Sequence, residues 1–286
     1  MSDGFINLNK PANMTSHDAV NIVRKIFDTR KVGHAGTLDP AATGVLPVAV
    51  GRATKFLEYL SDRDKTYRAE ILFGVATTTG DITGEILRRE ENFFMPGLDE
   101  LKRAAKNFSG QIEQTPPKFS AIKLNGRKAY ELARKNIDFE LPKRIVTINR
   151  FEILSVEKNF VTVEVDCSKG TYIRTLAEDF GASLKLPATI KNLQRVRVGE
   201  FKIENSATPD ELKNRGEEFL KPVEFCLTHF EKFDLPEHRQ KAFLSGLPTD
   251  VFKPDSIVRV YVGEKFLGTG KISGGELKSD KQFATQ

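Results

Sequence analysis

The amino-acid sequence predicts a mixed α/β protein. Long amphipathic segments alternate with short strand-like runs, and no internal repeat or low-complexity tract interrupts them. The chain has 286 residues, of which 39% are hydrophobic, enough for one large domain and a small appendage. From about Leu235 the chain changes to short runs broken by glycine and proline, which favours a β-rich module. We therefore expect two domains, residues 1–231 and 232–286.

Three helices are predicted from apolar residues at helical spacing. The first begins at a capping box formed by Thr15 and Asp18 and continues to about residue 27. A second is expected over residues 53–60 and a third over 173–184. The apolar stripe of the third helix leaves Arg174 near the helix N-terminus and off the centre of the stripe.

Strands are predicted where apolar residues alternate. The clearest examples cover residues 67–73 and 161–167, and the C-terminal module adds 256–262 and 265–271. The segment 33–44 contains glycines and a proline that rule out a continuous helix, so we expect a loop there.

The overall composition excludes several classes of protein. No stretch approaches the roughly 18 apolar residues that a membrane helix needs, and the N-terminus does not resemble a signal peptide, so we expect a cytoplasmic protein without membrane contact. Cys167 and Cys226 are too few for a disulfide framework, and the four histidines lack ligand spacing, so no metal site is expected. A net charge of +5 permits a nucleic-acid partner.

The glycine-bounded loop contains one candidate catalytic carboxylate, Asp39. Its structural interpretation is a turn or a helix cap with Pro40 at the first helical position. His34 is open to two interpretations in the same way, as a base or as a hydrogen-bonded structural residue. The loop is a poor phosphate cradle, because it lacks a Gly-Lys-Ser/Thr ending and contains an aspartate.

A basic segment covers residues 118–135. It contains six cationic side chains against one acid, Glu131, with Phe119 and Tyr130 among them, and Asn125-Gly126 predicts a tight hairpin turn. One interpretation is an RNA contact that combines cations with stacking surfaces. The other is a solvated hairpin whose lysines protect an edge strand. The candidate RNA contacts are Lys118, Lys123, Arg127 and Lys128.

Several short blocks, in this order, resemble the TruB family of tRNA pseudouridine-55 synthases. The longest is the loop 33–47, which resembles the family's catalytic motif. The other blocks are Asn9-Lys10-Pro11 with Thr15-Ser16, Gly51-Arg52-Ala53-Thr54-Lys55, Asp64-Lys65-Thr66-Tyr67-Arg68, Gln114-Thr115-Pro116-Pro117 with Ser120-Ala121, and Cys167-Ser168-Lys169-Gly170-Thr171-Tyr172-Ile173-Arg174. Together they cover most of residues 5 to 200.

The resemblance implies a pseudouridine synthase fold with a largely antiparallel sheet, a basic insertion near 115–145 and a small PUA-like RNA-binding domain. It makes Asp39 the essential carboxylate, Arg174 its ion-pair partner and Tyr67 the ring that stacks on the target base. The implied substrate contacts are His34, Tyr172, Leu193, Lys10 and Lys55. The family often has Thr-Asp-Thr where this chain has Thr77-Thr78-Thr79, and the C-terminal module matches only loosely.

The implied function is isomerisation of uridine 55 in the T loop of tRNA, without a cofactor or an obligatory protein partner. The chemistry suits the residue types, because a carboxylate can act as nucleophile or base while the glycosidic bond is broken and re-formed. Two rivals remain at this point. A non-catalytic RNA-binding or tRNA-chaperone protein would have no need for Asp39 with Arg174, and a nucleotide-binding enzyme would need a phosphate-binding lysine in the loop 33–44.

Overall fold

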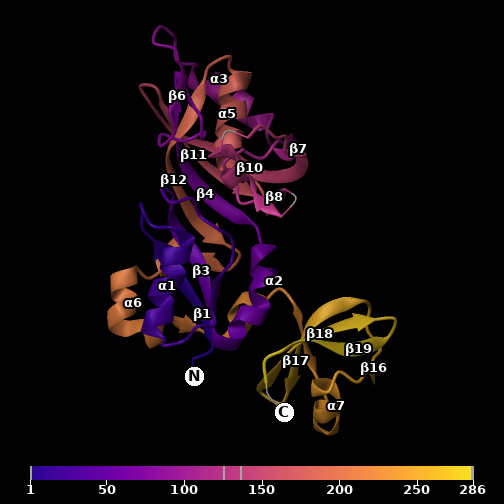
Figure 1. The fold of residues 1–286 in the computed structure, drawn as a ribbon. Helices are drawn as coiled ribbons and strands as arrows, with labels where there is room; N and C mark the ends of the chain where they lie inside the picture. Colours follow the sequence, from indigo (N-terminus) through magenta and orange to yellow (C-terminus); the bar gives the residue numbers. More distant parts are fainter. Residues whose placement is uncertain (1, 125, 136, 285–286) are drawn as a thin grey trace.

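A computed structural model describes residues 2–124, 126–135 and 137–284. The chain forms a large α/β unit built on a ten-stranded sheet, followed by a five-stranded β unit at the C-terminus (Figure 1). The mixed α/β class predicted from the sequence is therefore confirmed. The expected boundary between residues 231 and 232 falls at the first residues of strand β15 (Glu231–Asp234). Among the described residues, no helix is long and apolar enough to cross a membrane.

The large sheet has the strand order β14-β1-β3-β12-β4-β11-β10-β7, with β2 beside β3 and β13 beside β12. Its strands are β1 (Gly4–Lys10), β2 (Val32–His34), β3 (Thr43–Val50), β4 (Lys65–Phe73), β7 (Gly110–Gln114), β10 (Arg144–Glu157), β11 (Phe160–Cys167), β12 (Ala188–Val198), β13 (Phe201–Lys202) and β14 (Leu220–Lys221). Every described pairing in this sheet is antiparallel except that of β3 with β12. That parallel junction joins the two halves of the sheet.

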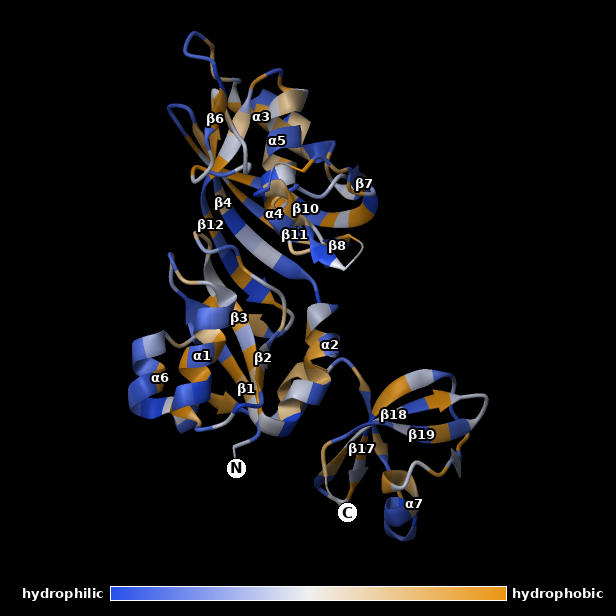
Figure 2. Ribbon diagram, viewed as in Figure 1, coloured by the Kyte–Doolittle hydropathy of each residue, from blue (hydrophilic) through white to orange (hydrophobic). Residues whose placement is uncertain are grey.

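Helices cover the sheet and bury its apolar face. They are α1 (Ser16–Ile26), α2 (Leu57–Ser61), α3 (Leu98–Lys106), α4 (Ala129–Ala133), α5 (Ile173–Ser183) and α6 (Pro209–Arg215). Helices α3 and α5 lie against one half of the sheet, and α1 and α6 lie at the other (Figure 1). Figure 2 shows many hydrophobic residues in β1 and β3, whereas α6 is largely hydrophilic.

Local patterns account for several of these elements. The Thr15 side chain accepts a hydrogen bond from the backbone of Asp18, and the carboxylate of Asp18 accepts from the Thr15 backbone, which confirms the capping box of α1. Strand β4 buries Tyr67 and every second residue after it through Phe73, as the alternation predicts. Strand β11 and helix α5 also occupy the segments predicted for them.

The region after the first helix differs from prediction. The expected loop 33–44 is shorter, because its ends belong to β2 and β3 and only residues 35–42 lie outside strands. No helix begins at Pro40. The second helix starts as the 3₁₀ helix η1 (Gly51–Phe56) before α2, and the Thr54 hydroxyl donates to the Gly51 carbonyl at 2.8 Å. Strand β3 was not predicted, because it is buried on both faces and gives no alternation.

Two short hairpins project from the large unit. One pairs β5 (Val75–Thr77) with β6 (Ile86–Arg89), and the other pairs β8 (Lys123–Leu124) with β9 (Arg127–Lys128). The second hairpin lies where the Asn125-Gly126 turn was predicted, although Asn125 itself is outside the described residues.

The C-terminal unit has its own small core and shares a second core with the large unit. Its sheet order is β15-β17-β18-β19-β16, with β16 (Thr249–Asp250), β17 (Ser256–Val262), β18 (Lys265–Ser273), β19 (Glu276–Gln282) and the helix α7 (Gln240–Leu244). At the junction, the ring centroids of Phe56 and Phe266 are 6.1 Å apart, and the Tyr59 hydroxyl lies 2.9 Å from Oγ1 of Thr269. Apolar and polar contacts therefore fix the small unit against η1 and α2.

Candidate active site

A row of paired residues crosses four neighbouring strands at the junction of the sheet. Lys10 of β1 pairs with Gly44 of β3, Gly44 pairs with Arg195 of β12, and Arg195 pairs with Tyr67 of β4. Paired residues project from the same face of a sheet, so these side chains lie on one side. Gly44 has φ +103°, and a Cβ there would lie 2.2 Å from the Arg195 carbonyl oxygen. Only glycine allows β12 to approach this closely.

The loop 35–42 crosses this row and is held at both ends. The Ala35 amide donates to the Pro47 carbonyl at 2.9 Å, and the Ala42 amide donates to the Asp39 carbonyl at 3.1 Å. Between them, the side chain of Leu38 is buried and its amide donates to Oγ of Ser16 at 2.9 Å. Because the residue before it is anchored in the core, Asp39 is presented from a rigid turn.

Asp39 forms an ion pair with Arg174 at the start of α5. Oδ2 of Asp39 lies 2.9 Å from Nε of Arg174, and the two side chains are 39% and 5% exposed. The other guanidinium nitrogens donate to the carbonyls of Thr79, at 2.7 Å, and Phe119, at 2.9 Å. All three nitrogens of Arg174 are therefore used, which fixes its orientation and that of the carboxylate.

Tyr67 lies beside this ion pair on β4. Its ring is almost completely buried, and burial raises the pKa of its phenol above the usual value, an effect that the Arg195 guanidinium partly offsets. The charge of Asp39 also acts on the phenol and raises its pKa. The structure thus brings together the three residues predicted to be catalytic: Asp39, Arg174 and Tyr67.

His34 and Lys10 lie next to the loop. Burial is the main reason that the pKa of His34 is lowered, and the positive charge of Arg195 adds to it, so the imidazole is neutral at physiological pH. Lys10 is completely buried, and its ammonium donates to the carbonyls of Pro11, Met14 and Pro40 at 2.9, 2.7 and 3.2 Å. Burial lowers the pKa of Lys10 to about 8, although Asp39 opposes the shift. Lys10 therefore supports the loop from behind.

Two other predicted substrate contacts, Leu193 and Lys55, lie in different parts of the structure. Leu193 is half-buried on β12, two residues before Arg195 and opposite Ala69 of β4. Lys55 is exposed on η1, and its ammonium donates to the carbonyl of Gln282 in the C-terminal unit at 3.0 Å. Leu193 therefore lies near the row of paired residues, whereas Lys55 contacts the other unit.

Tyr172 is held by partners to which the sequence had assigned no role. The Tyr172 amide donates to Oε1 of Gln114 at 2.8 Å, and Nε2 of Gln114 donates back to the Tyr172 carbonyl at 3.0 Å. The guanidinium of Arg144 lies 5.1 Å from the centre of the Tyr172 ring, within the range of a cation–π contact. Gln114 belongs to one of the blocks described above, but only the folded structure shows that its side chain reaches Tyr172.

The basic insertion is attached to the site through its backbone. The carbonyl of Phe119 accepts the hydrogen bond from Arg174, and beyond it Lys123 and Arg127 are exposed on the β8–β9 hairpin. Lys118 pairs with Asp138 at 2.7 Å. By contrast Lys123, Arg127 and Lys128 form no ion pair with any residue in the described ranges.

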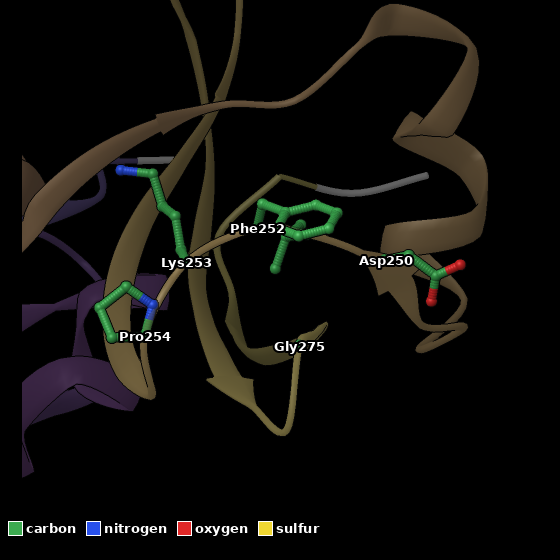
Figure 3. A pocket seen from close by; sticks show the side chains of 6 residues that line it. Asp250, Phe252, Lys253, Pro254 and Gly275 are labelled. Atoms are coloured by element: carbon green, nitrogen blue, oxygen red, sulfur yellow. The ribbon is translucent and has the colours of Figure 1, made fainter.

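Other parts of the surface offer little chemistry. Within the part of the chain that the structure describes, no group of three histidine, cysteine, aspartate or glutamate side chains could hold a metal ion. A hollow of about 790 Å³ lies in the C-terminal unit between Asp250 and Gly275, with Phe252 beside it (Figure 3). None of the predicted site residues lines this hollow.

Comparison with known proteins identifies the class. The family described as "TruB family pseudouridylate synthase (N terminal domain)" matches residues 24–173, more than half of the chain. A solved Cbf5-Nop10-Gar1 complex contains a chain that is 25% identical, with a TM-score of 0.77, and the match covers 98% of this chain and 85% of that one. The family match and the fold together define a pseudouridine synthase.

Two curated relatives agree with this assignment. The tRNA pseudouridine synthase B of Clostridium tetani is 40% identical over 276 residues, covering 94% of this chain and 95% of that protein. The protein of the same name from Bacillus pumilus is 46% identical over 245 residues, covering 82% and 79%. The chain belongs to the TruB family.

Proposed function

We propose that this protein isomerises a uridine of tRNA to pseudouridine in the cytoplasm, with Asp39 as the reacting carboxylate. The ion pair between Asp39 and Arg174 beside the ring of Tyr67 carries this proposal. Membership of the TruB family and the name tRNA pseudouridine synthase B of the relatives support tRNA as the substrate. The proposed reaction uses neither a cofactor nor a second protein.

The reaction is an internal rearrangement of the nucleoside. The bond between N1 and C1′ breaks, the uracil turns, and C5 bonds to C1′; one proton leaves C5 and one is added to N1, so no electrons are gained or lost. Oδ2 of Asp39 is held by Arg174, whereas Oδ1 accepts no hydrogen bond from the described part of the chain. The free oxygen is therefore the one available to act as nucleophile or base.

The target base must leave its stack before Asp39 can reach it. Tyr67 is 9% exposed, and in this proposal a flipped uracil covers the part that is still accessible. Such stacking is worth ~1–3 kcal/mol per base. Tyr67 therefore provides a surface for the base once it is outside the helix.

The basic insertion serves as a contact for the RNA backbone in this proposal. Lys123 and Arg127 are exposed and unpaired within the described ranges, and the insertion is joined to Arg174 through Phe119. Phosphate contacts fix the position of the RNA without selecting a base. On the family resemblance, the RNA is the T arm of tRNA and the selected base is uridine 55 of its T loop.

The C-terminal unit, residues 232–286, is proposed as a second, PUA-like RNA contact. Phe252 is fully exposed, and Lys253 follows it at the edge of the hollow in this unit (Figure 3). An exposed aromatic ring next to a cation can stack on an unpaired base and contact its phosphate.

Chemical mapping of pseudouridine on an unmodified tRNA transcript tests the proposed function. The purified protein should produce one modified position, uridine 55, and a transcript with cytidine at that position should remain unmodified. Binding of tRNA without any pseudouridine would instead favour a non-catalytic RNA-binding or tRNA-chaperone protein. Modification at another uridine would keep the reaction and refute the T-loop assignment.

A further inference from the structure

Arg195 is a buried side chain to which neither the resemblance nor the proposed reaction assigns a role. It is 1% exposed and is the largest of the fully buried side chains. Its Nε donates to the Val45 carbonyl at 2.8 Å, and Nη2 donates to the Gly36 carbonyl at 3.1 Å. Gly36 lies near the start of the loop 35–42 and Val45 lies in β3 just beyond its end, so one guanidinium joins the loop to the strand that follows it.

The same guanidinium faces Tyr67. Arg195 and Tyr67 are directly paired across β12 and β4, and the interaction lowers the pKa of the phenol against the opposing effect of burial. The planar guanidinium of Arg195 therefore contacts both the Asp39 loop and the side chain of Tyr67, and fixes the position of one relative to the other. A fork with several donors in fixed geometry is suited to this task, whereas an ammonium on a flexible stem is not.

The charge of Arg195 has no carboxylate partner. Within the described ranges, no aspartate or glutamate oxygen lies within 4.0 Å of its guanidinium, as an ion pair would require. Burial is the main reason that the pKa values of Lys10, Lys65 and His34 are lowered, and the charge of Arg195 adds to the effect at each. An unpaired buried cation is costly to stability, so a purely structural role would be served better by a neutral donor.

We infer that Arg195 is a positioning residue for the proposed isomerisation, which ties the Asp39 loop to β3 beside Tyr67 and keeps this part of the site positively charged. Breaking the bond between N1 and C1′ leaves the electron pair on the uracil, and addition of a nucleophile to the ring also makes the base anionic. A fixed positive charge close to the base favours either species over the neutral substrate. Arg195 would therefore affect turnover rather than the binding of tRNA.

The test compares Arg195→Met and Arg195→Lys with Arg197→Met. Arg197 lies on the same strand, but it pairs with Asp166 at 2.8 Å and donates to Thr66, so it is the matched control. We expect Arg195→Met to lower kcat on the order of 100-fold, the effect of a small displacement of reacting groups. The Kd for tRNA should stay within about threefold of the parent value. Arg195→Lys, which keeps the charge without the fork, should give an intermediate kcat, and Arg197→Met should be close to the parent.

Tyrosine resonances provide a readout that does not depend on turnover. The chain has five tyrosines and no tryptophan, so carbon-13 labelling at Cζ gives few signals, and Tyr67→Phe identifies the one from Tyr67. In Arg195→Met this phenol should ionise at a higher pH than in the parent, whereas in Arg195→Lys and Arg197→Met it should titrate as in the parent.

The outcomes separate this inference, which rests on the proposed function, from that function itself. A folded Arg195→Met with parental kcat, or an unchanged Tyr67 titration in that variant, overturns the inference. If Arg195→Met does not fold, a parental kcat in Arg195→Lys overturns it as well, whereas a reduced kcat with unchanged Kd supports it. If the parent protein forms no pseudouridine, the proposed function fails, and the Tyr67 titration still decides whether Arg195 controls the phenol.

Discussion

The guanidinium of Arg174 is bound on three sides, and Nε lies 2.9 Å from Oδ2 of Asp39. The two other donors are committed to the carbonyls of Thr79 and Phe119. Arg174 therefore stays in place even if the loop moves. The position of the Asp39 carboxylate is set by two separate elements, its own loop and the helix α5 that carries Arg174.

Asp39→Asn keeps the size of the side chain but removes its charge. Because the reaction needs a nucleophile or a base, we expect turnover to fall by at least about 10⁴-fold. The Kd for tRNA should change little, since no hydrogen bond or ion pair joins the Asp39 side chain to the described residues of the basic insertion. The measurement is single-turnover formation of pseudouridine beside a filter-binding assay. Asp210→Asn, on the exposed surface of α6, is the control and should remain fully active.

Two results with Asp39→Asn would contradict the catalytic role of this carboxylate or the expected effect of the substitution. Pseudouridine formation by Asp39→Asn near the parent rate would remove this carboxylate from the chemistry. A parallel loss of tRNA binding would show instead that the substitution disrupts the loop.

Tyr67 should contribute through its ring. We expect Tyr67→Phe to bind tRNA about as tightly as the parent, whereas Tyr67→Ala should lose ~1–3 kcal/mol of binding free energy because a flipped base has no surface on which to stack. Equilibrium binding to a tRNA with 5-fluorouridine at position 55, compared with uridine, measures this. A slow Tyr67→Phe that still binds normally would assign the hydroxyl to proton transfer. Parental binding by Tyr67→Ala would exclude the ring from the site.

The basic insertion predicts a salt effect. Replacing Lys123, Arg127 and Lys128 together by Gln should weaken tRNA binding and flatten the dependence of log Kd on log salt, because fewer counterions are released. The position of the modified uridine should not change, since phosphate contacts do not read the base. Titrations at several salt concentrations give the slope. A triple Gln replacement of Arg88, Arg150 and Lys213, which are already paired with acids and lie outside the basic insertion and the C-terminal unit, is the control.

The two outcomes of that titration distinguish the interpretations of this hairpin. A slope equal to that of the parent would mean that its cations are only solvated. A shift of the modified position would show that the hairpin also selects the base.

Glu178 gives a prediction for stability against pH. Burial, and then the charge of Asp179, raises the pKa of Glu178 to about 7, and Arg174 opposes the shift. Between the unfolded pKa near 4.5 and the folded value, the folded state binds more protons, so this group makes the protein less stable as pH rises through that interval. Replacement by Gln removes the titration. We therefore expect Glu178→Gln to be more stable than the parent at pH 8 by on the order of 1 kcal/mol, after allowance for solvent screening, and about equal to it near pH 4.5.

Urea unfolding at the two pH values measures this difference. Glu157→Gln, at the exposed end of β10, should not change the free energy of unfolding at either pH. A Glu178→Gln variant that gains nothing at pH 8 would show that the carboxylate is solvated rather than buried.

The sequence predicted those elements whose signal is local. The capping box of α1 and the alternation in β4 are visible within a few residues, and the structure confirms both. Strand β3 was missed because it is buried on both faces and contains Pro47, which argues against a central strand. Local patterns do not reveal a strand of this kind.

The sequence predicted which residues form the site, but not the contacts that hold them in place. The blocks that resemble the TruB family identified Asp39 and Arg174, and the ion pair between them is present. Arg195 was missed because its role depends on pairing with Gly44 and Tyr67, which are distant in sequence. The orientation of Lys55 likewise depends on how the C-terminal unit packs against η1. Contacts of this kind arise from strand register and from the packing of the two units, which no local period encodes.

The parallel junction of β3 with β12 also determines the order in which the site can appear during synthesis. Only two residue pairs, Thr43 with Gln194 and Gly44 with Arg195, make this junction. A nascent chain that ends before β12 already contains Asp39, Tyr67 and Arg174. It lacks the strand that joins β3, which follows the Asp39 loop, to β4, which carries Tyr67. We therefore expect the growing chain to remain inactive towards tRNA until residues 188–198 have left the ribosome, so that the enzyme gains its activity in one late step.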